Sequence, residues 1–182
     1  MSPPRARRSR NHAIDIMIES SRWNAVPEAT QTIRRAISAT AQKAHVRAEL
    51  SVVLTNDASI RALNYHWRKQ NKPTNVLSFP AGVHIGPKDV PRPLGDIVIA
   101  YETLAREAKA EQKPFLHHLA HLSVHGFLHL LGYDHDSEAN AEKMEQFERT
   151  ILARLGIPDP YRTGTANPTP DHHARPRRAR SR

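Results

Sequence analysis

The chain has 182 residues, with 27 Lys and Arg against 18 Asp and Glu, and a formal net charge of +9. This length fits one domain of about 100–200 residues and makes a second catalytic domain unexpected. The sequence contains no cysteine, which excludes disulfide scaffolds, thiol catalysis and thiolate metal sites, so a metal ion would have to be held by His, Asp or Glu.

The first half of the sequence predicts two strands, each followed by a helix. Apolar and polar residues alternate over 14–18, which predicts a half-buried strand, and Pro27 marks the start of a helix with one apolar face. Residues 50–54 predict a second strand, and the Thr-Asn-Asp sequence after it is a good helix cap. A helix over about 58–69 follows. Its apolar stripe consists of Ile60, Leu63 and Trp67.

The second half predicts two more strands and three helices. The strands are expected over 75–79 and 96–101, with a Pro- and Gly-rich loop over 80–94 between them. The helices are expected over about 102–112, 114–131 and 138–155. This order predicts an α+β domain in which about five helices pack on a small mixed β-sheet of about four strands.

Most of the positive charge lies at the two ends of the sequence. Residues 1–10 contain four Arg and no acid, and residues 163–182 contain five Arg and one Asp, so each end contributes +4. Such Pro- and Arg-rich ends have little apolar surface, which predicts disordered basic arms over 1–11 and 163–182 around a single domain over 12–162. Their expected partner is a polyanion, and the alternative is a solubilising tail.

No segment has the pattern of an export signal or a membrane span. The apolar stretch over 14–18 is short and is interrupted by Asp15. Residues 114–133 carry no formal charge, but five of them are His, which is unsuitable for a hydrocarbon environment. We therefore expect no membrane partner.

The long helix predicted over 114–131 carries histidines at helical spacing. On a helical wheel His125 and His129 lie just outside the apolar stripe and one turn apart, where two imidazoles can converge on one ion. Gly132 favours a left-handed turn that ends the helix and can return His135 to the same ion. Three His and an open fourth position suit catalytic zinc, so we predict one Zn²⁺ at His125, His129 and His135.

The His and Gly spacing coincides with that of the H-E-x-x-H-x-x-G-x-x-H motif of metzincin proteases, with one departure. The Glu that acts as general base in those proteases is replaced here by Gly126, so peptide hydrolysis loses its proton acceptor. Zinc can still polarise a phosphoryl oxygen, which leaves a phosphodiester as an accessible substrate. His121 is a candidate for moving the proton, with a structural role as the alternative. Asp134 and Asp136 are candidates for supporting or replacing a ligand.

The segment from His125 to His135 resembles the signature His-Gly-x-Leu-His-Leu-x-Gly-Tyr-Asp-His of the YbeY-type rRNA maturation factors, a family of bacterial endoribonucleases. Lys-Pro-Thr-Asn-Val-Leu-Ser-Phe at 72–79 and Leu-Gly-Asp-Ile-Val-Ile at 94–99 extend the resemblance, which covers residues 12–161. The resemblance implies a cytoplasmic, zinc-dependent endoribonuclease specific for single-stranded RNA. It also implies a role in 16S rRNA 3′-end maturation and ribosome quality control, with precursor 16S rRNA and the small ribosomal subunit as partners.

The resemblance carries a family arginine onto Arg68, which together with His125 is our catalytic candidate. A planar guanidinium can hold phosphate oxygens at two points and stabilise charge added in a pentacovalent transition state. The residues around it mix positive charge with stacking faces, as single-stranded RNA favours: Arg61, Tyr65, Trp67, Lys69 and Lys72. The alternative is that Trp67 belongs to the core and the lysines are merely solvated.

Two other classes of function remain open. One is a non-catalytic ribosome-assembly module with a structural zinc ion, which an open, water-bearing coordination position would argue against. The other is a metalloprotease, which Gly126 disfavours and which an assay of casein against single-stranded RNA would separate from a nuclease.

Overall fold

The computed structural model describes residues 13–82 and 92–162, so the predicted arms and much of the predicted 80–94 loop lie outside the described residues. Within these ranges the chain forms four strands, five α-helices and one short 3₁₀ helix. The strands are β1 (Ala13–Ile18), β2 (Ala48–Thr55), β3 (Val76–Pro80) and β4 (Arg92–Ala100). The helices are η1 (Ser21–Ala25), α1 (Ala29–Lys43), α2 (Asp57–Arg68), α3 (Tyr101–Ala110), α4 (Phe115–Leu130) and α5 (Glu138–Arg154). The predicted α+β class is confirmed.

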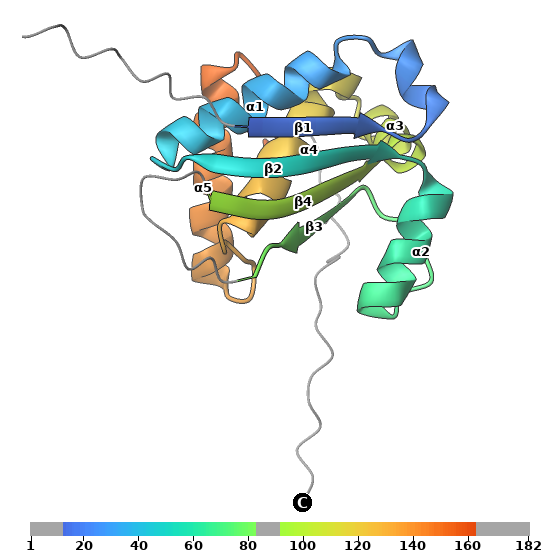
Figure 1. The fold of residues 1–182 in the computed structure, drawn as a ribbon. Coiled ribbons are helices and arrows are strands. Elements are labelled where there is room, and N and C mark those ends of the chain that lie inside the picture. The colour runs from blue at the N-terminus through green and yellow to red at the C-terminus, as the bar shows by residue number, and fades with distance from the viewer. Residues whose placement is uncertain (1–12, 83–91, 163–182) are drawn as a thin grey trace, which may run out of the picture.

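The strands form one mixed sheet in the order β1-β2-β4-β3 (Figure 1). Strands β1, β2 and β4 are parallel to one another, and β3 runs antiparallel to β4 at the sheet edge. Parallel neighbours need a long crossover connection, which α1 supplies between β1 and β2. Strand β3 needs no such crossover, because an antiparallel neighbour can return directly to β4.

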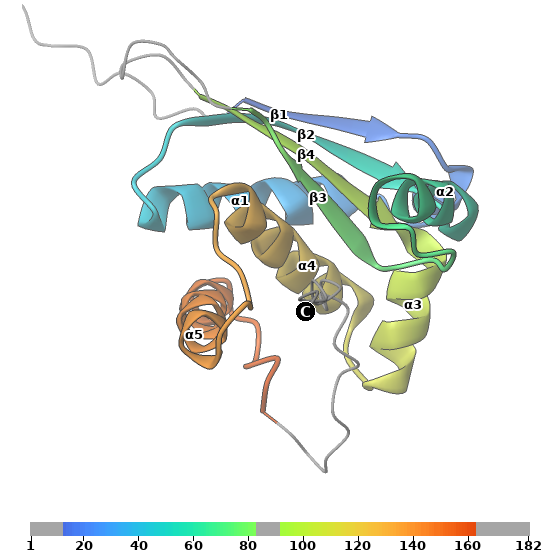
Figure 2. The same ribbon diagram turned by 90° about the horizontal axis from the view of Figure 1, so that it is seen from below.

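The helices form layers on the sheet, with α4 in the middle (Figure 2). Alternate residues of the strands, among them Val52, Ile97 and Ile99, form the main core with α1 and α4. The opposite face of the sheet is covered in part by α2, whose Ile60 packs with Leu77 and Val98. Helix α5 packs on the side of α4 away from the sheet. Helix α4 is therefore enclosed between the sheet and α5.

Close contact between α4 and the sheet depends on Gly126. A Cβ at this position would lie 3.1 Å from Ile97 Cγ2, 3.1 Å from Ser78 Oγ and 3.4 Å from Val76 Cγ2. The Ser78 hydroxyl also donates to the Gly126 carbonyl at 3.0 Å, which joins β3 to the helix. The position that carries the general base in metzincin proteases is here part of the helix–sheet contact.

Three details differ from the sequence-based expectation. Strand β4 begins at Arg92, inside the predicted loop, because Gly95 adopts φ +126° next to a register shift that lets the strand pair with β2. The 3₁₀ helix η1 was not predicted, and it buries Trp23, which donates from Nε1 to the Thr55 carbonyl at 2.9 Å. Trp67 is 64% exposed with its ring 5.9 Å from that of Phe79, so it lies at the margin of the α2 contact and the alternative that it belongs to the core is wrong. Within 13–82 and 92–162, no helix has the length and apolar character needed to cross a membrane.

Candidate metal centre

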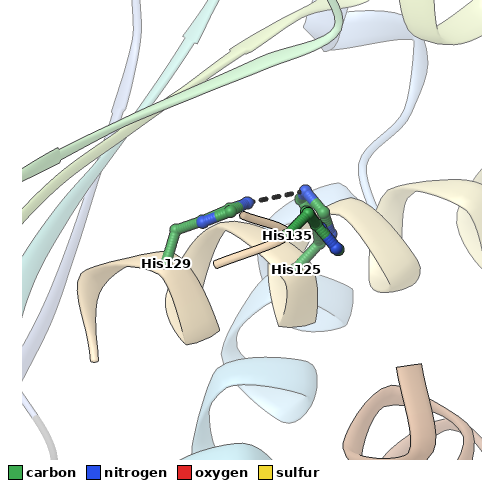
Figure 3. Close-up of side chains that lie close together, drawn as sticks. All are labelled: His125, His129 and His135. Atoms are coloured by element: carbon green, nitrogen blue, oxygen red, sulfur yellow. Dashed lines mark hydrogen bonds between the residues drawn. The ribbon is translucent and has the colours of Figure 1, made fainter. Parts of the chain in front are cut away.

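Helix α4 and the turn after it bring three histidines together (Figure 3). His125 and His129 are one helical turn apart near the carboxyl end of α4. The helix then closes with a bond from the Tyr133 N–H to the Leu128 carbonyl, and Gly132 adopts the left-handed φ of +91° that this reversal requires. His135 is thereby returned to the helix, so that one ligand atom from each of the three histidines lies within 4.8 Å of the others.

The three imidazole rings lie close together. His125 Nε2 and His129 Nε2 are 3.0 Å apart. The ring of His135 lies 5.3 Å from that of His125 and nearly parallel to it, and 5.5 Å from that of His129. All three side chains are partly buried. The structure thus assembles the predicted ligand residues, and metal binding by them stays a prediction.

The partners of the Nδ1 atoms determine what the Nε2 atoms can do. His125 donates from Nδ1 to Glu148 Oε1 at 2.8 Å, and His129 donates from Nδ1 to the Tyr133 carbonyl at 2.9 Å. Both partners are acceptors, so in a neutral ring each Nδ1 carries the proton and each Nε2 presents a lone pair.

Two nitrogen atoms that lie 3.0 Å apart with their lone pairs toward each other repel unless a cation lies between or beside them. That cation can be a proton or a metal ion. Two nitrogens on a tetrahedral zinc ion, each at about 2.0–2.1 Å, would lie about 3.3 Å apart, which is a few tenths of an ångström from the observed spacing. The donor set therefore fits zinc.

A buried glutamate that sequence reasoning missed lies behind this cluster. Glu148 of α5 has no exposed surface, and its carboxylate accepts three hydrogen bonds. Besides His125, the donors are His121 through Nε2, at 2.9 Å, and the Tyr161 hydroxyl. Because His121 donates to Glu148, and because its buried Nδ1 has no hydrogen-bond partner among the described residues, the geometry favours the structural role of His121.

A signal for Glu148 does exist in the sequence. Met144, Ile151 and Leu152 are the buried apolar positions of α5, and residue 148 falls on the same stripe at helical spacing. A charged residue in an apolar stripe indicates a buried partner or a site. The identity of the partner still required the packing of α5 against α4.

Three pKa shifts accompany this geometry. Burial raises the pKa of Glu148, but the hydrogen bonds from His121 and His125 outweigh it and hold this pKa below its usual range. Burial, reinforced by the charge of Glu148, raises the pKa of Tyr161, so its hydroxyl stays protonated and donates. Burial, together with nearby His125, lowers the pKa of His135 and favours the neutral ring that a metal ligand needs.

The predicted supporting acids contribute to the turn and not to the cluster. Asp134 Oδ1 accepts from the Asp136 N–H at 3.1 Å and from Asn140 Nδ2 at 2.8 Å. The hydrogen bond from Asn140 is the main reason that the pKa of Asp134 is lowered. Among the described residues, neither Asp134 nor Asp136 belongs to the group whose ligand atoms converge.

Arg68, the other catalytic candidate, is the last residue of α2. Within the described parts of the chain its guanidinium makes no ion pair, and partial burial lowers its pKa while leaving it protonated at neutral pH. Tyr65 and Trp67 on the same helix are 57% and 64% exposed. The role of Arg68 in catalysis stays a prediction.

Three histidines on a helix and its following turn, one of them hydrogen-bonded to a buried carboxylate, form a group that could hold a metal ion in an α+β domain. The model of the family described as Endoribonuclease YbeY matches residues 15–156. The chain belongs to this family.

Proteins that carry the name Endoribonuclease YbeY are similar to most of the chain. The protein of Bradyrhizobium sp. is 57% identical over 153 residues, which cover 81% of this chain and 90% of that protein. Those of Rhodopseudomonas palustris strain BisA53 and Nitrobacter winogradskyi are 56% identical over 154 residues and 55% identical over 160 residues. The match covers 82% of this chain and 90% of the Rhodopseudomonas palustris protein. It covers 85% of this chain and 84% of the Nitrobacter winogradskyi protein. The solution structure of TM1509 from Thermotoga maritima is 23% identical, covering 82% of this chain and 99% of that one, with a TM-score of 0.47.

Proposed function

We propose that the protein is a zinc-dependent endoribonuclease specific for single-stranded RNA, which acts in 3′-end maturation of 16S rRNA and in ribosome quality control. The observation that carries this proposal is the convergence of three histidine nitrogens. Membership of the family supports an RNA substrate, because relatives 53–57% identical to the chain are named endoribonucleases. Precursor 16S rRNA and the small ribosomal subunit as partners, and a cytoplasmic location, follow from the family resemblance.

His125 and His129 would bind the zinc ion through Nε2, and His135 would supply the third ligand. The ion would act as a Lewis acid that polarises a phosphoryl oxygen and makes water more acidic. The chain contributes the orientation of the ligands, since Glu148 and the Tyr133 carbonyl hold the two Nδ1 atoms from outside. Residue 126 contributes no base, because it is a glycine packed against the sheet.

Arg68 would contact the scissile phosphate or an adjacent one. Its interaction grows with the negative charge that develops on the phosphoryl group, so it would stabilise the transition state more than the bound substrate. The exposed rings of Tyr65 and Trp67, on the same helix, would stack on unpaired bases. Helix α2 would thereby contribute both positive charge and base contacts.

Elemental analysis tests the metal site. Purified wild-type protein is expected to hold about one zinc ion per chain, and His129→Ala to lose it, because two ligands hold zinc far less tightly than three. His117→Ala is a matched control, since His117 lies on the same helix but outside the cluster. A His129→Ala variant that retains one tightly bound zinc ion would show that the site is wrong.

Single-turnover cleavage at saturating protein tests Arg68. Arg68→Ala should keep the fold and the zinc ion but lose most cleavage, and Arg68→Lys should recover part of it, because an ammonium group cannot make two-point contact. Arg61→Ala is the matched control, since Arg61 lies on the same helix and donates to Asn71 at 2.8 Å. A wild-type rate for Arg68→Ala, with weaker RNA binding, would reduce Arg68 to an RNA-binding residue.

The same assays separate the two alternatives. Absence of cleavage by the zinc-bound protein would favour a non-catalytic module with a structural ion, whereas cleavage that persists in the zinc-free protein would contradict zinc-dependent chemistry. Chelator-sensitive hydrolysis of casein in place of RNA would favour a metalloprotease. That outcome would contradict the expectation from Gly126, which is packed against the sheet at the position of the protease general base.

A further inference from the structure

We propose that Glu148 is a positioning residue for the metal site, whose carboxylate decides which nitrogen of His125 faces the ion. This inference rests on the proposed function, because it assumes that His125 is a metal ligand. It concerns a residue 23 positions away from His125, on a different helix.

The first argument is the hydrogen bond itself. An ionised carboxylate only accepts, so Glu148 Oε1, 2.8 Å from His125 Nδ1, keeps the proton on that nitrogen. The lone pair of His125 must then be on Nε2, which is the atom that lies 3.0 Å from His129 Nε2. Without an acceptor at Nδ1 the ring could carry its proton on Nε2 and turn a donor toward the ion.

The second argument is that the carboxylate is itself held in place. Its other oxygen, Oε2, accepts from His121 Nε2 at 2.9 Å and from the Tyr161 hydroxyl. These donors come from α4 and from the segment after α5, so the carboxylate cannot rotate away from His125 without breaking two hydrogen bonds. Oε1 thus remains available to accept the hydrogen bond from the His125 ring.

The third argument is the cost of placing a charge at this position. An ionised side chain without exposed surface is expensive unless it is paired, and Glu148 pairs with no Lys or Arg in the described ranges. Its neighbour Arg149 pairs instead with Glu145 and Asp159. Core packing alone would be satisfied by an apolar residue, as at Met144 and Ile151 on the same stripe. A cation bound at the histidines would compensate the buried negative charge.

Zinc affinity of matched variants tests this proposal. Glu148→Gln keeps the shape but offers one acceptor oxygen in place of two, and no charge. Glu107→Gln is the control, because Glu107 of α3 accepts from Nε2 of His118 at 2.9 Å, and His118 is a histidine of α4 outside the cluster. The dissociation constant for zinc, measured by competition with a chelator, should rise about 10–100-fold for Glu148→Gln and stay within about twofold for Glu107→Gln.

The outcomes are distinguishable. Equal zinc affinity of Glu148→Gln and the wild type would overturn the proposal, and so would an equal loss in Glu107→Gln, because the effect would then be a general loosening of α4. Failure of the wild type to bind zinc would instead overturn the proposed function, on which this inference rests.

A second measurement depends on no variant. The ring nitrogen chemical shifts of His125 in the zinc-free wild-type protein, obtained by NMR, report which nitrogen carries the proton. The proposal requires the proton on Nδ1, and a ring protonated on Nε2 alone would overturn it even if Glu148→Gln fails to fold.

Discussion

Replacing Gly126 by alanine should destabilise the protein, although alanine is the better helix former. The new Cβ would lie 3.1 Å from Ile97 Cγ2 and from Ser78 Oγ, whereas carbon atoms in favourable contact are about 3.5–4.0 Å apart. Ile97 has no exposed surface, and the Ser78 hydroxyl is held by its bond to the Gly126 carbonyl. Neither neighbour can move aside freely.

Two opposing terms set the magnitude. In a helix interior, alanine is more stable than glycine by about 1 kcal/mol. Overpacking a well-filled core costs about 1–3 kcal/mol. The net loss should be about 1 kcal/mol, which for a domain of this size corresponds to a fall in Tm of about 2–4 °C. Gly126→Glu, which restores the protease pattern, would also bury an unpaired carboxylate against the sheet, so we expect no stable fold.

Thermal unfolding followed by circular dichroism measures the effect on zinc-free protein. Gly82→Ala is the control, because a Cβ at residue 82 would meet no atom within 4 Å. A Gly126→Ala variant as stable as the wild type, or more stable, would refute the reasoning that Gly126 is required for close packing. Folded Gly126→Glu protein that hydrolyses casein would refute it more strongly.

Three further predictions follow from other features. Trp67→Ala should weaken the binding of single-stranded RNA by about 1–3 kcal/mol. Its Tm should not change, because the side chain is 64% exposed, and a large fall in Tm would contradict that placement. Chelation should lower the Tm of the wild type but not of His129→Ala, since a ligand that binds the folded state stabilises it. Removing 1–10 and 163–182 should flatten the salt dependence of RNA affinity with little change in turnover at saturating RNA. An unchanged salt dependence would instead indicate solubilising tails.

The cluster of three histidines was predictable because its geometry is local. The pitch of a helix places residues four apart on one side, which sets His125 and His129, and a glycine that adopts positive φ returns His135 after one short turn. The strand and helix order was predictable for a similar reason, since alternation and helical spacing both act over a few residues.

Features that depend on tertiary packing could not be predicted in the same way. The periodicity of α2 places Trp67 on the side of Ile60, where its ring lies 5.9 Å from that of Phe79 on the edge strand β3 but stays 64% exposed. Helix α5 contains several acidic residues. Its apolar stripe singles out position 148 among them but does not identify the partner of this residue. That partner is set by the way α5 crosses α4.

The hydrogen bond from Tyr161 to Glu148 also determines where the following segment begins. Glu148 also accepts from His125. Tyr161 is therefore joined to the histidine cluster through two successive hydrogen bonds, with Glu148 between them. Five Arg lie in residues 163–182. If these Arg bind a polyanion, as the sequence predicts, their covalent connection to Tyr161 would raise its effective concentration at the cluster without any additional contact to the domain. The hydrogen bond of Tyr161 to Glu148 would thereby link the capture of RNA by these Arg to its delivery to the histidine cluster.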